Sequence, residues 1–186
     1  MSDSRLYVAL VHHPVVDKNG ETIASAVTNL DLHDIARVCR TYGAKRFHVI
    51  TPLADQVVLV NRILAHWIAG PGGRYNPKRR QALELIRVQE RFEESVAAIA
   101  GEEGRRPLIV ATTARRRENS LAWRQLREML ANEIPVLLAF GTAWGLTDNF
   151  MVAADHVLEP LAGTNTYNHL SVRSAVAIIL DRLLGR

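Results

Sequence analysis

The sequence contains one cysteine, Cys39, among its 186 residues. A single cysteine cannot form an internal disulfide, and it offers no clustered ligands for a metal ion. No apolar run approaches the roughly 18 residues that would span a bilayer. The first apolar run, Leu6–Val11, is too short and too poorly flanked to be a signal peptide. We therefore expect a cytoplasmic protein with no metal ion and no membrane segment.

The chain also lacks the usual phosphate-binding motifs. No G-x-G-x-x-G follows its first apolar run, and there is no Walker-type loop. These absences disfavour a doubly wound α/β enzyme with a nucleotide cofactor, which we keep only as the last alternative.

Composition and charge are those of an ordinary folded domain with a basic surface. Apolar residues make up 48% and charged residues 23% of the chain, and its length favours one domain over residues 1–186. The formal net charge of +4 favours a polyanionic partner. Basic residues cluster at Lys78–Arg80, Arg105–Arg106 and Arg115–Arg117. Such clusters are often only solvated surface, so both interpretations stay open.

Short β-rich apolar runs alternate with helical periodicity along the chain. This pattern predicts an α/β fold with a mostly parallel sheet and helices on both faces. We expect strands at 6–11, 47–50, 86–88, 108–111, 135–140 and 157–158, and helices at 31–42, 56–69, 77–85, 92–100, 121–130 and 172–184. Gly70–Gly73 is expected to open a mobile loop.

Three loops that follow predicted strands have unusual composition. In open α/β sheets, ligands bind where loops leave the carboxyl ends of the strands. Thr112–Arg115 is the first such loop, and Gly141–Leu146, which brackets Trp144 with glycines, is the second. The third, Glu159–Ser171, is long and polar and enters the last helix at Ser171, a good N-cap residue.

These loops resemble the cofactor site of the SPOUT methyltransferases, which carry a deep C-terminal trefoil knot. Phe140–Leu146 is similar to the second motif of that class, and Leu158–Leu161 followed by Asn168–Ala175 is similar to the third. The first motif of the SpoU branch is matched by Arg37, six residues before Gly43, and by the following strand and proline. The resemblance implies a knot over about residues 107–186. The phrases Thr28–Asp31 and Tyr167–Ser171 point to a small bacterial branch of SAM-dependent RNA methyltransferases.

The resemblance implies that S-adenosylmethionine is the cofactor and that backbone groups make most of its contacts. The cofactor-binding residues implied in this way are Thr112, Thr113, Leu138, Phe140, Gly141, Thr142, Trp144, Gly145, Leu158, Glu159, Pro160, Leu161, Asn168, His169, Leu170, Ser171 and Ser174.

Arg37, His169 and Arg173 are the candidate catalytic residues. Arginine is a poor base because its pKa stays above about 12, so Arg37 would act through charge and hydrogen bonds. His169 and His33 could titrate near neutral pH. Arg173 could contact RNA or form a salt bridge, and we leave both possibilities open.

The implied partners are RNA and a second copy of the chain, paired through the C-terminal and first helices. Residues 70–80 could close over substrate or simply link two helices. The candidate RNA-binding residues are Arg40, Tyr75, Arg79, Arg80, Arg115 and Arg116.

The sequence departs from the family pattern at four positions. Asp31 and Asp34 stand where the SpoU motif usually has asparagines, and Ser171 and Arg173 stand where the third motif usually has Asn and Ser. We expect methylation of tRNA or rRNA, at a base nitrogen or a ribose 2′-hydroxyl. The alternative is a catalytically inactive knotted RNA-binding protein that retains the cofactor pocket.

Overall fold

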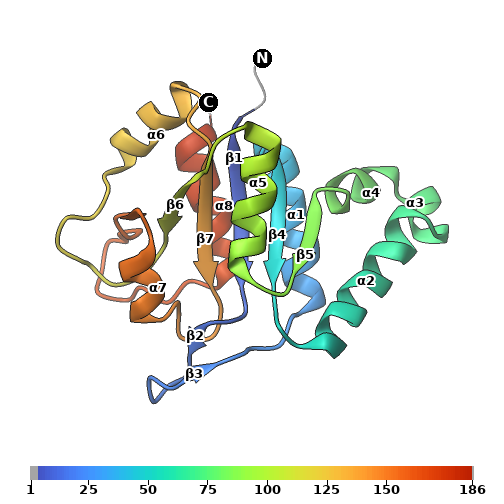
Figure 1. Cartoon of the computed structure of the whole chain (residues 1–186), viewed down its shortest axis with the longest axis horizontal. Helices are drawn as coiled ribbons and strands as arrows, with labels where there is room; N and C mark the ends of the chain where they lie inside the picture. Colours follow the sequence, from blue (N-terminus) through green and yellow to red (C-terminus); the bar gives the residue numbers. More distant parts are fainter. Residues whose placement is uncertain (1–3, 186) are drawn as a thin grey trace.

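The computed structural model describes residues 4–185 and has a six-stranded sheet at its centre (Figure 1). The strand order is β5-β4-β1-β7-β6-β8, and every neighbouring pair is parallel. All six strands expected from the sequence are present, and their carboxyl ends lie at one edge. Their bounds are β1 Leu6–Val11, β4 Arg46–Ile50, β5 Ile86–Gln89, β6 Leu108–Ala111, β7 Val136–Gly141 and β8 His156–Val157.

Strand β1 lies in the middle of the sheet and is buried along its whole length. Val8 is paired with Phe47 of β4 on one side and with Leu138 of β7 on the other. A parallel strand covered on both faces needs a continuous apolar run rather than an alternating one. The run Leu6–Val11 meets this requirement.

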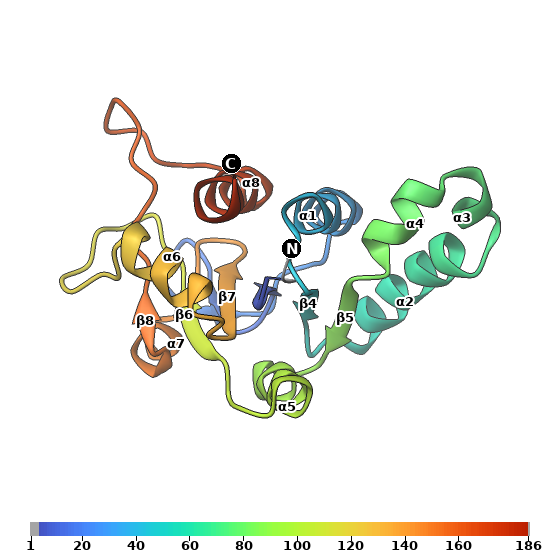
Figure 2. The same ribbon diagram turned by 90° about the horizontal axis from the view of Figure 1, so that it is seen from above.

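Helices cover both faces of the sheet, as the sequence predicts (Figure 2). On one face α1 (Asn29–Tyr42) and α8 (Val172–Leu184) lie side by side, and α6 (Trp123–Ala131) contacts α8. On the other face lie α5 (Phe92–Glu103) and α7 (Asp148–Ala153), a short helix that the sequence analysis missed. Within residues 4–185, none of the helices combines the length and apolar character needed to cross a membrane.

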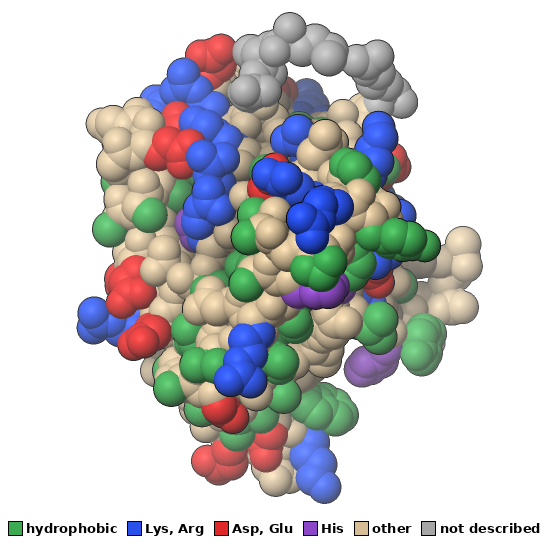
Figure 3. All heavy atoms as spheres, turned by 90° about the vertical axis from the view of Figure 1, so that its right-hand side faces the viewer, with side chains coloured by type: hydrophobic (Ala, Val, Ile, Leu, Met, Phe, Trp, Pro, Cys, Tyr) green, Lys and Arg blue, Asp and Glu red, His purple; other side chains and the backbone are tan. Residues whose placement is uncertain are grey.

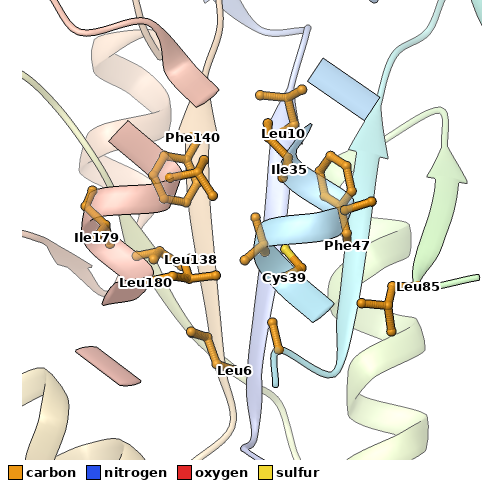
Figure 4. Packing of buried hydrophobic residues seen from close by; sticks show 14 of the residues in the cluster. Leu6, Leu10, Ile35, Cys39, Phe47, Leu85, Leu138, Phe140, Ile179 and Leu180 are labelled. Carbon is orange, nitrogen blue, oxygen red and sulfur yellow. The ribbon is translucent and has the colours of Figure 1, made fainter. Parts of the chain in front are cut away.

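The core between the sheet and the α1–α8 layer is formed by alternate side chains of the strands (Figure 4). Leu138 and Phe140 of β7 point toward α8, where Leu180 packs against them. Cys39 of α1 is part of the same cluster. Complete burial raises the pKa of its thiol above its usual range, so Cys39 serves as a small apolar side chain.

A β-hairpin between β1 and α1 forms a second, two-stranded sheet. β2 (Val15–Val16) and β3 (Thr22–Ile23) pair antiparallel, and neither is among the strands expected from the sequence. Gly20 has a φ of 85° in the turn between them, as expected for an Asn-Gly pair.

The segment between β4 and β5 is an arm of three helices, α2 (Ala54–Ile68), α3 (Pro71–Tyr75) and α4 (Pro77–Leu83). The expectation of a mobile loop beginning at Gly70–Gly73 was therefore wrong. Gly73 lies so close to α2 that an added Cβ would be 2.4 Å from the Trp67 carbonyl oxygen. Asn76 then caps α4 by accepting a hydrogen bond from the Arg79 amide at 3.0 Å. Glycine here permits close helix packing, which sequence reasoning mistook for flexibility.

We expect Gly73→Ala to lower the free energy of unfolding by about 1–3 kcal/mol, because its methyl group would press on the backbone of α2. Gly101→Ala is the matched control, since its Cβ would enter open space within α5. That substitution should leave stability unchanged or raise it by about 0.5–1 kcal/mol. Urea denaturation measures both, and equal stability of the two variants would contradict the close packing.

Candidate functional site

Two of the three loops singled out by the sequence are tied together at the carboxyl edge of the sheet. Asn168 donates from its side-chain amide to the carbonyl oxygens of Ala114, at 2.9 Å, and Leu161, at 3.1 Å. The Glu159 carboxylate accepts a hydrogen bond from the Trp123 amide at 2.9 Å. The polar third loop is therefore held against the loop after β6, and Asn168 and Glu159 make these connections.

The loop after β7 is a tight turn whose backbone geometry requires glycine at two positions. A Cβ on Gly141 would lie 2.5 Å from the Leu146 nitrogen, and Gly145 has a φ of 110°. The turn itself explains both glycines, without any ligand. Trp144 projects from it with 59% of its surface exposed, so an apolar ring is available beside the loop edge.

The hairpin β2–β3 is hydrogen-bonded to this turn, a contact that no sequence signal revealed. The Val16 amide donates to the Gly145 carbonyl at 2.9 Å, and the Trp144 amide donates to the Val16 carbonyl at 3.0 Å. Thr142 donates from its hydroxyl to the Val11 carbonyl at 3.0 Å. The turn is thus fixed from two sides before any ligand binds.

Buried polar side chains lie beneath the same edge. His12 is fully buried, and its Nδ1 lies 3.1 Å from the Ser25 hydroxyl, which is 2.5 Å from the Thr142 hydroxyl. Burial lowers the pKa of His12 to about 4, an effect that the Asp31 carboxylate only partly offsets. His12 is therefore neutral at pH 7. No sequence signal pointed to His12 or Ser25.

Two departures from the family pattern turn out to be partners in one ion pair. Arg173 of α8 binds the Asp31 carboxylate of α1 at 2.7 Å and lies 3.4 Å from the Asp34 carboxylate. Asp31 is almost fully buried, so the pair has a fixed geometry. The salt bridge that the sequence left open for Arg173 is present, and it joins the first turns of α1 and α8.

Arg37 is exposed on α1, one turn after His33. Burial, together with the nearby Arg79 and Arg37 cations, lowers the pKa of His33, although Asp34 acts in the opposite direction. His33 is consequently neutral at pH 7 and able to accept a proton. Arg40 is also exposed, near the end of α1. His169 is exposed in the third loop, where its ring lies 5.7 Å from that of Tyr167.

The other residues assigned to the cofactor fall into two groups. Exposed or half-buried positions at the loop edge are Thr112, Thr113, Pro160, Leu170, Ser171 and Ser174, and the Ser171 hydroxyl caps α8 by accepting from the Ser174 amide. Leu138, Phe140, Leu158 and Leu161 are buried, and their side chains belong to the core beneath the edge. Only their backbone groups are therefore candidates for contact with a ligand.

The loop edge fits S-adenosylmethionine by the chemistry of its groups. It combines apolar surface from Trp144 and Leu170 with hydroxyls of Thr112, Thr113 and Ser171, a mixture suited to an adenosine and an amino-acid tail. A hollow of about 460 Å³ lies elsewhere, between residues 117–119 and 154–157, and none of the assigned cofactor residues lines it. Residues 4–185 contain no group of three side chains suited to a metal ion.

Solved structures similar to this chain define the class of its fold. A probable methylase family protein from Haemophilus influenzae Rd KW20 matches with a TM-score of 0.62 and 16% identity, over 97% of this chain and 65% of that one. A TrmH/SpoU tRNA modifying enzyme of A. aeolicus matches with a TM-score of 0.58 and 15% identity, over 97% and 74%. The SpoU methyltransferase AviRb from Streptomyces viridochromogenes, in complex with AdoMet, matches with a TM-score of 0.55 and 18% identity, over 99% and 58%. The fold is that of the SpoU-type SPOUT methyltransferases.

The family model described as SAM-dependent RNA methyltransferase matches residues 5–185, and the chain belongs to that family. The family is described as SAM-dependent, which agrees with the cofactor that the sequence resemblance implied.

Relatives with similar sequences include both long and short proteins. A protein named "tRNA (guanine-N(1)-)-methyltransferase" from Oleidesulfovibrio alaskensis is 45% identical over 97% of this chain, and one of the same name from Nitratidesulfovibrio vulgaris is 47% identical over 97%. The chain spans 42% of the length of each. An Aquifex aeolicus protein described as "Uncharacterized protein" is 38% identical over 100% of this chain and 91% of its own length.

We expect Gly141→Ala to weaken S-adenosylmethionine binding by at least about tenfold, because the new Cβ would displace the Leu146 backbone and open the turn. Gly163→Ala, in the third loop, adds the same methyl group in open space and should bind like the wild type. Isothermal titration calorimetry compares the two. Unchanged affinity of Gly141→Ala would show that the cofactor binds away from this turn.

Proposed function

We propose that this chain transfers the methyl group of S-adenosylmethionine, bound at the three-loop edge, to a nucleotide of tRNA or rRNA in the cytoplasm. The observation that carries this proposal is the joining of the loops after β6 and β8 through Asn168, beside the fixed turn after β7. We further propose that the chain from about residue 107 forms a trefoil knot. The hydrogen bonds of Asn168 to the loops after β6 and β8 support this, because a threaded chain would hold these two loops close together.

The guanine-N1 reaction in the names of the long relatives is not carried over to this chain. The chain covers 42% of each of those proteins, so their names do not assign that reaction to the matched part. The methylated atom is therefore proposed as either a base nitrogen or a ribose 2′-hydroxyl.

The residues of α1 supply the chemistry that surrounds the transfer. When bound, S-adenosylmethionine provides an electrophilic methyl group. Arg37, exposed and positively charged, would hold an RNA phosphate so that the acceptor lies in line with this group. His33 is neutral at pH 7 and one turn away, so it would take the proton that the acceptor loses. The Asp31–Arg173 pair would keep the start of α1 in position.

The same ion pair argues against the alternative of an inactive RNA-binding protein. Asp31 and Asp34 are the departures that kept this alternative open, and a further departure, Arg173, pairs with Asp31. Because Asp31 and Arg173 bind each other at 2.7 Å, they amount to one compensated change rather than two independent losses.

Incubation with tritiated S-adenosylmethionine and total bacterial RNA tests the activity, and nucleoside mass spectrometry of the digested RNA identifies the methylated atom. We expect Arg37→Ala to lower kcat by about 100-fold while the Kd for S-adenosylmethionine stays unchanged. Arg105→Ala, which removes an exposed cation before β6, should retain full activity. Wild-type turnover by Arg37→Ala would remove Arg37 from the mechanism, and methyl transfer to no RNA would refute the proposed function.

We also propose that the protein is a homodimer paired through α1 and α8. Leu30 of α1, 61% exposed, and Ile178 of α8, 36% exposed, are apolar side chains on these adjacent helices, and pairing would bury them (Figure 2). Such pairing would also bring the exposed Arg37 of one subunit toward the loops of its partner.

If this face is the interface, Leu30→Asp will shift the protein from dimer to monomer, because a carboxylate would be buried without a partner. Val152→Asp on α7 introduces the same charge at an exposed apolar position on the opposite face and should leave the dimer intact. Sedimentation equilibrium distinguishes these results. A dimeric Leu30→Asp variant, or a monomeric wild type, would contradict the proposed interface.

A further inference from the structure

The helical arm α2–α4 carries most of the excess positive charge of the chain. Residues 54–85 contain five Lys or Arg and two acidic residues, a net charge of +3 out of +4 for the whole chain. One of the acidic residues, Glu84, is already paired with Arg80 at 2.8 Å. Arg74, Lys78 and Arg79 form no ion pair with any residue in the described range 4–185. This charge density favours an anionic partner.

The helices of the arm pack closely on one another, which fixes the backbone positions of its charged residues. Gly72 and Gly73 seat α3 directly on α2, since a Cβ on either would collide with His66 or Trp67. The Arg79 guanidinium lies 4.5 Å from the centroid of the Trp67 ring. Stacking of this kind orients the planar guanidinium while leaving its edge free to donate hydrogen bonds.

Tyr75 gives the arm a second kind of contact. Its side chain at the end of α3 is 89% exposed, which is unusual for an aromatic residue on a rigid element. Arg74 precedes it and Lys78 follows three residues later, so the exposed ring has a cation on either side in the sequence. Figure 3 views this side of the molecule and shows Lys and Arg side chains interspersed with hydrophobic and histidine side chains.

The arm adjoins the residues assigned to the transfer. His33 of α1 contacts Trp67 edge to face, with ring centroids 5.5 Å apart, and α4 packs against α1. Arg37, the next turn of α1, is near enough to His33 to influence it together with Arg79. Arg79 of the arm and Arg37 of α1 therefore both lie near His33, and the arm adjoins the part of α1 that carries Arg37.

We propose that the α2–α4 arm binds a single-stranded segment of RNA, with phosphates held by Arg74, Lys78 and Arg79 and one base stacked on Tyr75. This inference rests on the proposed RNA methylation and assigns the arm to substrate recognition. An unpaired base can present its face to an exposed tyrosine, whereas bases within a duplex are stacked on each other. A flexible unpaired strand thus uses both kinds of contact, and a duplex uses only the charges.

Fluorescence anisotropy with a labelled single-stranded RNA 12-mer and the matching duplex tests the surface. We expect Tyr75→Ala to weaken binding of the single strand by about 5- to 100-fold and binding of the duplex hardly at all. Tyr75→Phe should restore the affinity, because it keeps the stacking ring. Because Tyr75 is exposed, its truncation removes no buried contact, and circular dichroism verifies that each variant is folded.

The charge contribution is tested by the double variant Arg74→Ala/Lys78→Ala. It should reduce the slope of log affinity against log salt by about 1.4 for the single strand, or 0.7 per phosphate lost. The control Arg91→Ala/Arg105→Ala removes the same charge at the two ends of α5, on the other face of the sheet. Its slope should remain that of the wild type.

Three results would overturn the proposal: unchanged affinity in the Tyr75→Ala and Arg74→Ala/Lys78→Ala variants, an equal loss in the α5 control, or binding of the arm to phosphatidylserine vesicles in preference to RNA. The anisotropy signal needs no methyl transfer. If the arm variants lose RNA binding but the wild-type protein methylates no RNA, the proposed function is refuted and the role of the arm in binding RNA stands. Full methyl transfer by the arm variants at limiting RNA would refute the arm alone.

Discussion

The parallel pairing of β1 with β4 on one side and β7 on the other is the constraint on which the rest of the structure depends. Both neighbours run in the same direction as β1, so every loop with functional potential leaves the sheet at one edge. His12 continues β1 into that edge, and Thr142 follows β7 directly beside it. A one-residue slip in this pairing would move the whole site, because alternate side chains would change faces.

Above this sheet, the site is organised by hydrogen bonds between segments that are distant in sequence. Ser25 is 117 residues from Thr142, and Asp31 is 142 residues from Arg173. The contacts connect the segment before α1 to the loop after β7, and α1 to α8. The two halves of the chain therefore define one site, in agreement with a family match that extends over residues 5–185 rather than over the C-terminal half alone.

The sequence predicted those parts of the molecule that follow from local patterns. Six apolar runs predicted the six strands, and α1 ends at Tyr42 as predicted, followed by Gly43 in the left-handed conformation. The hairpin β2–β3 escaped prediction because two-residue strands leave no periodic signal. The prediction of a mobile loop at Gly70–Gly73 was wrong because glycine permits both flexibility and close packing. Only the contact with Trp67, which the structure reveals, shows that close packing applies here. For the candidate site, the loops were predictable from composition. The Asp31–Arg173 pair was not predictable, because nothing in the sequence shows that two residues 142 positions apart bind each other.

The strand order also has a consequence for how the chain acquires its shape. β1 lies near the start of the sequence, but its neighbour β7 begins at Val136. One edge of β1 therefore stays unpaired until most of the chain has been synthesised. Pairings of such long range make folding slow, and an apolar strand with an unpaired edge can meanwhile associate with other chains. During synthesis on the ribosome, the nascent protein would pass through a stage in which its most apolar strand is half-covered. Chaperones that shield apolar segments would be most useful in that interval.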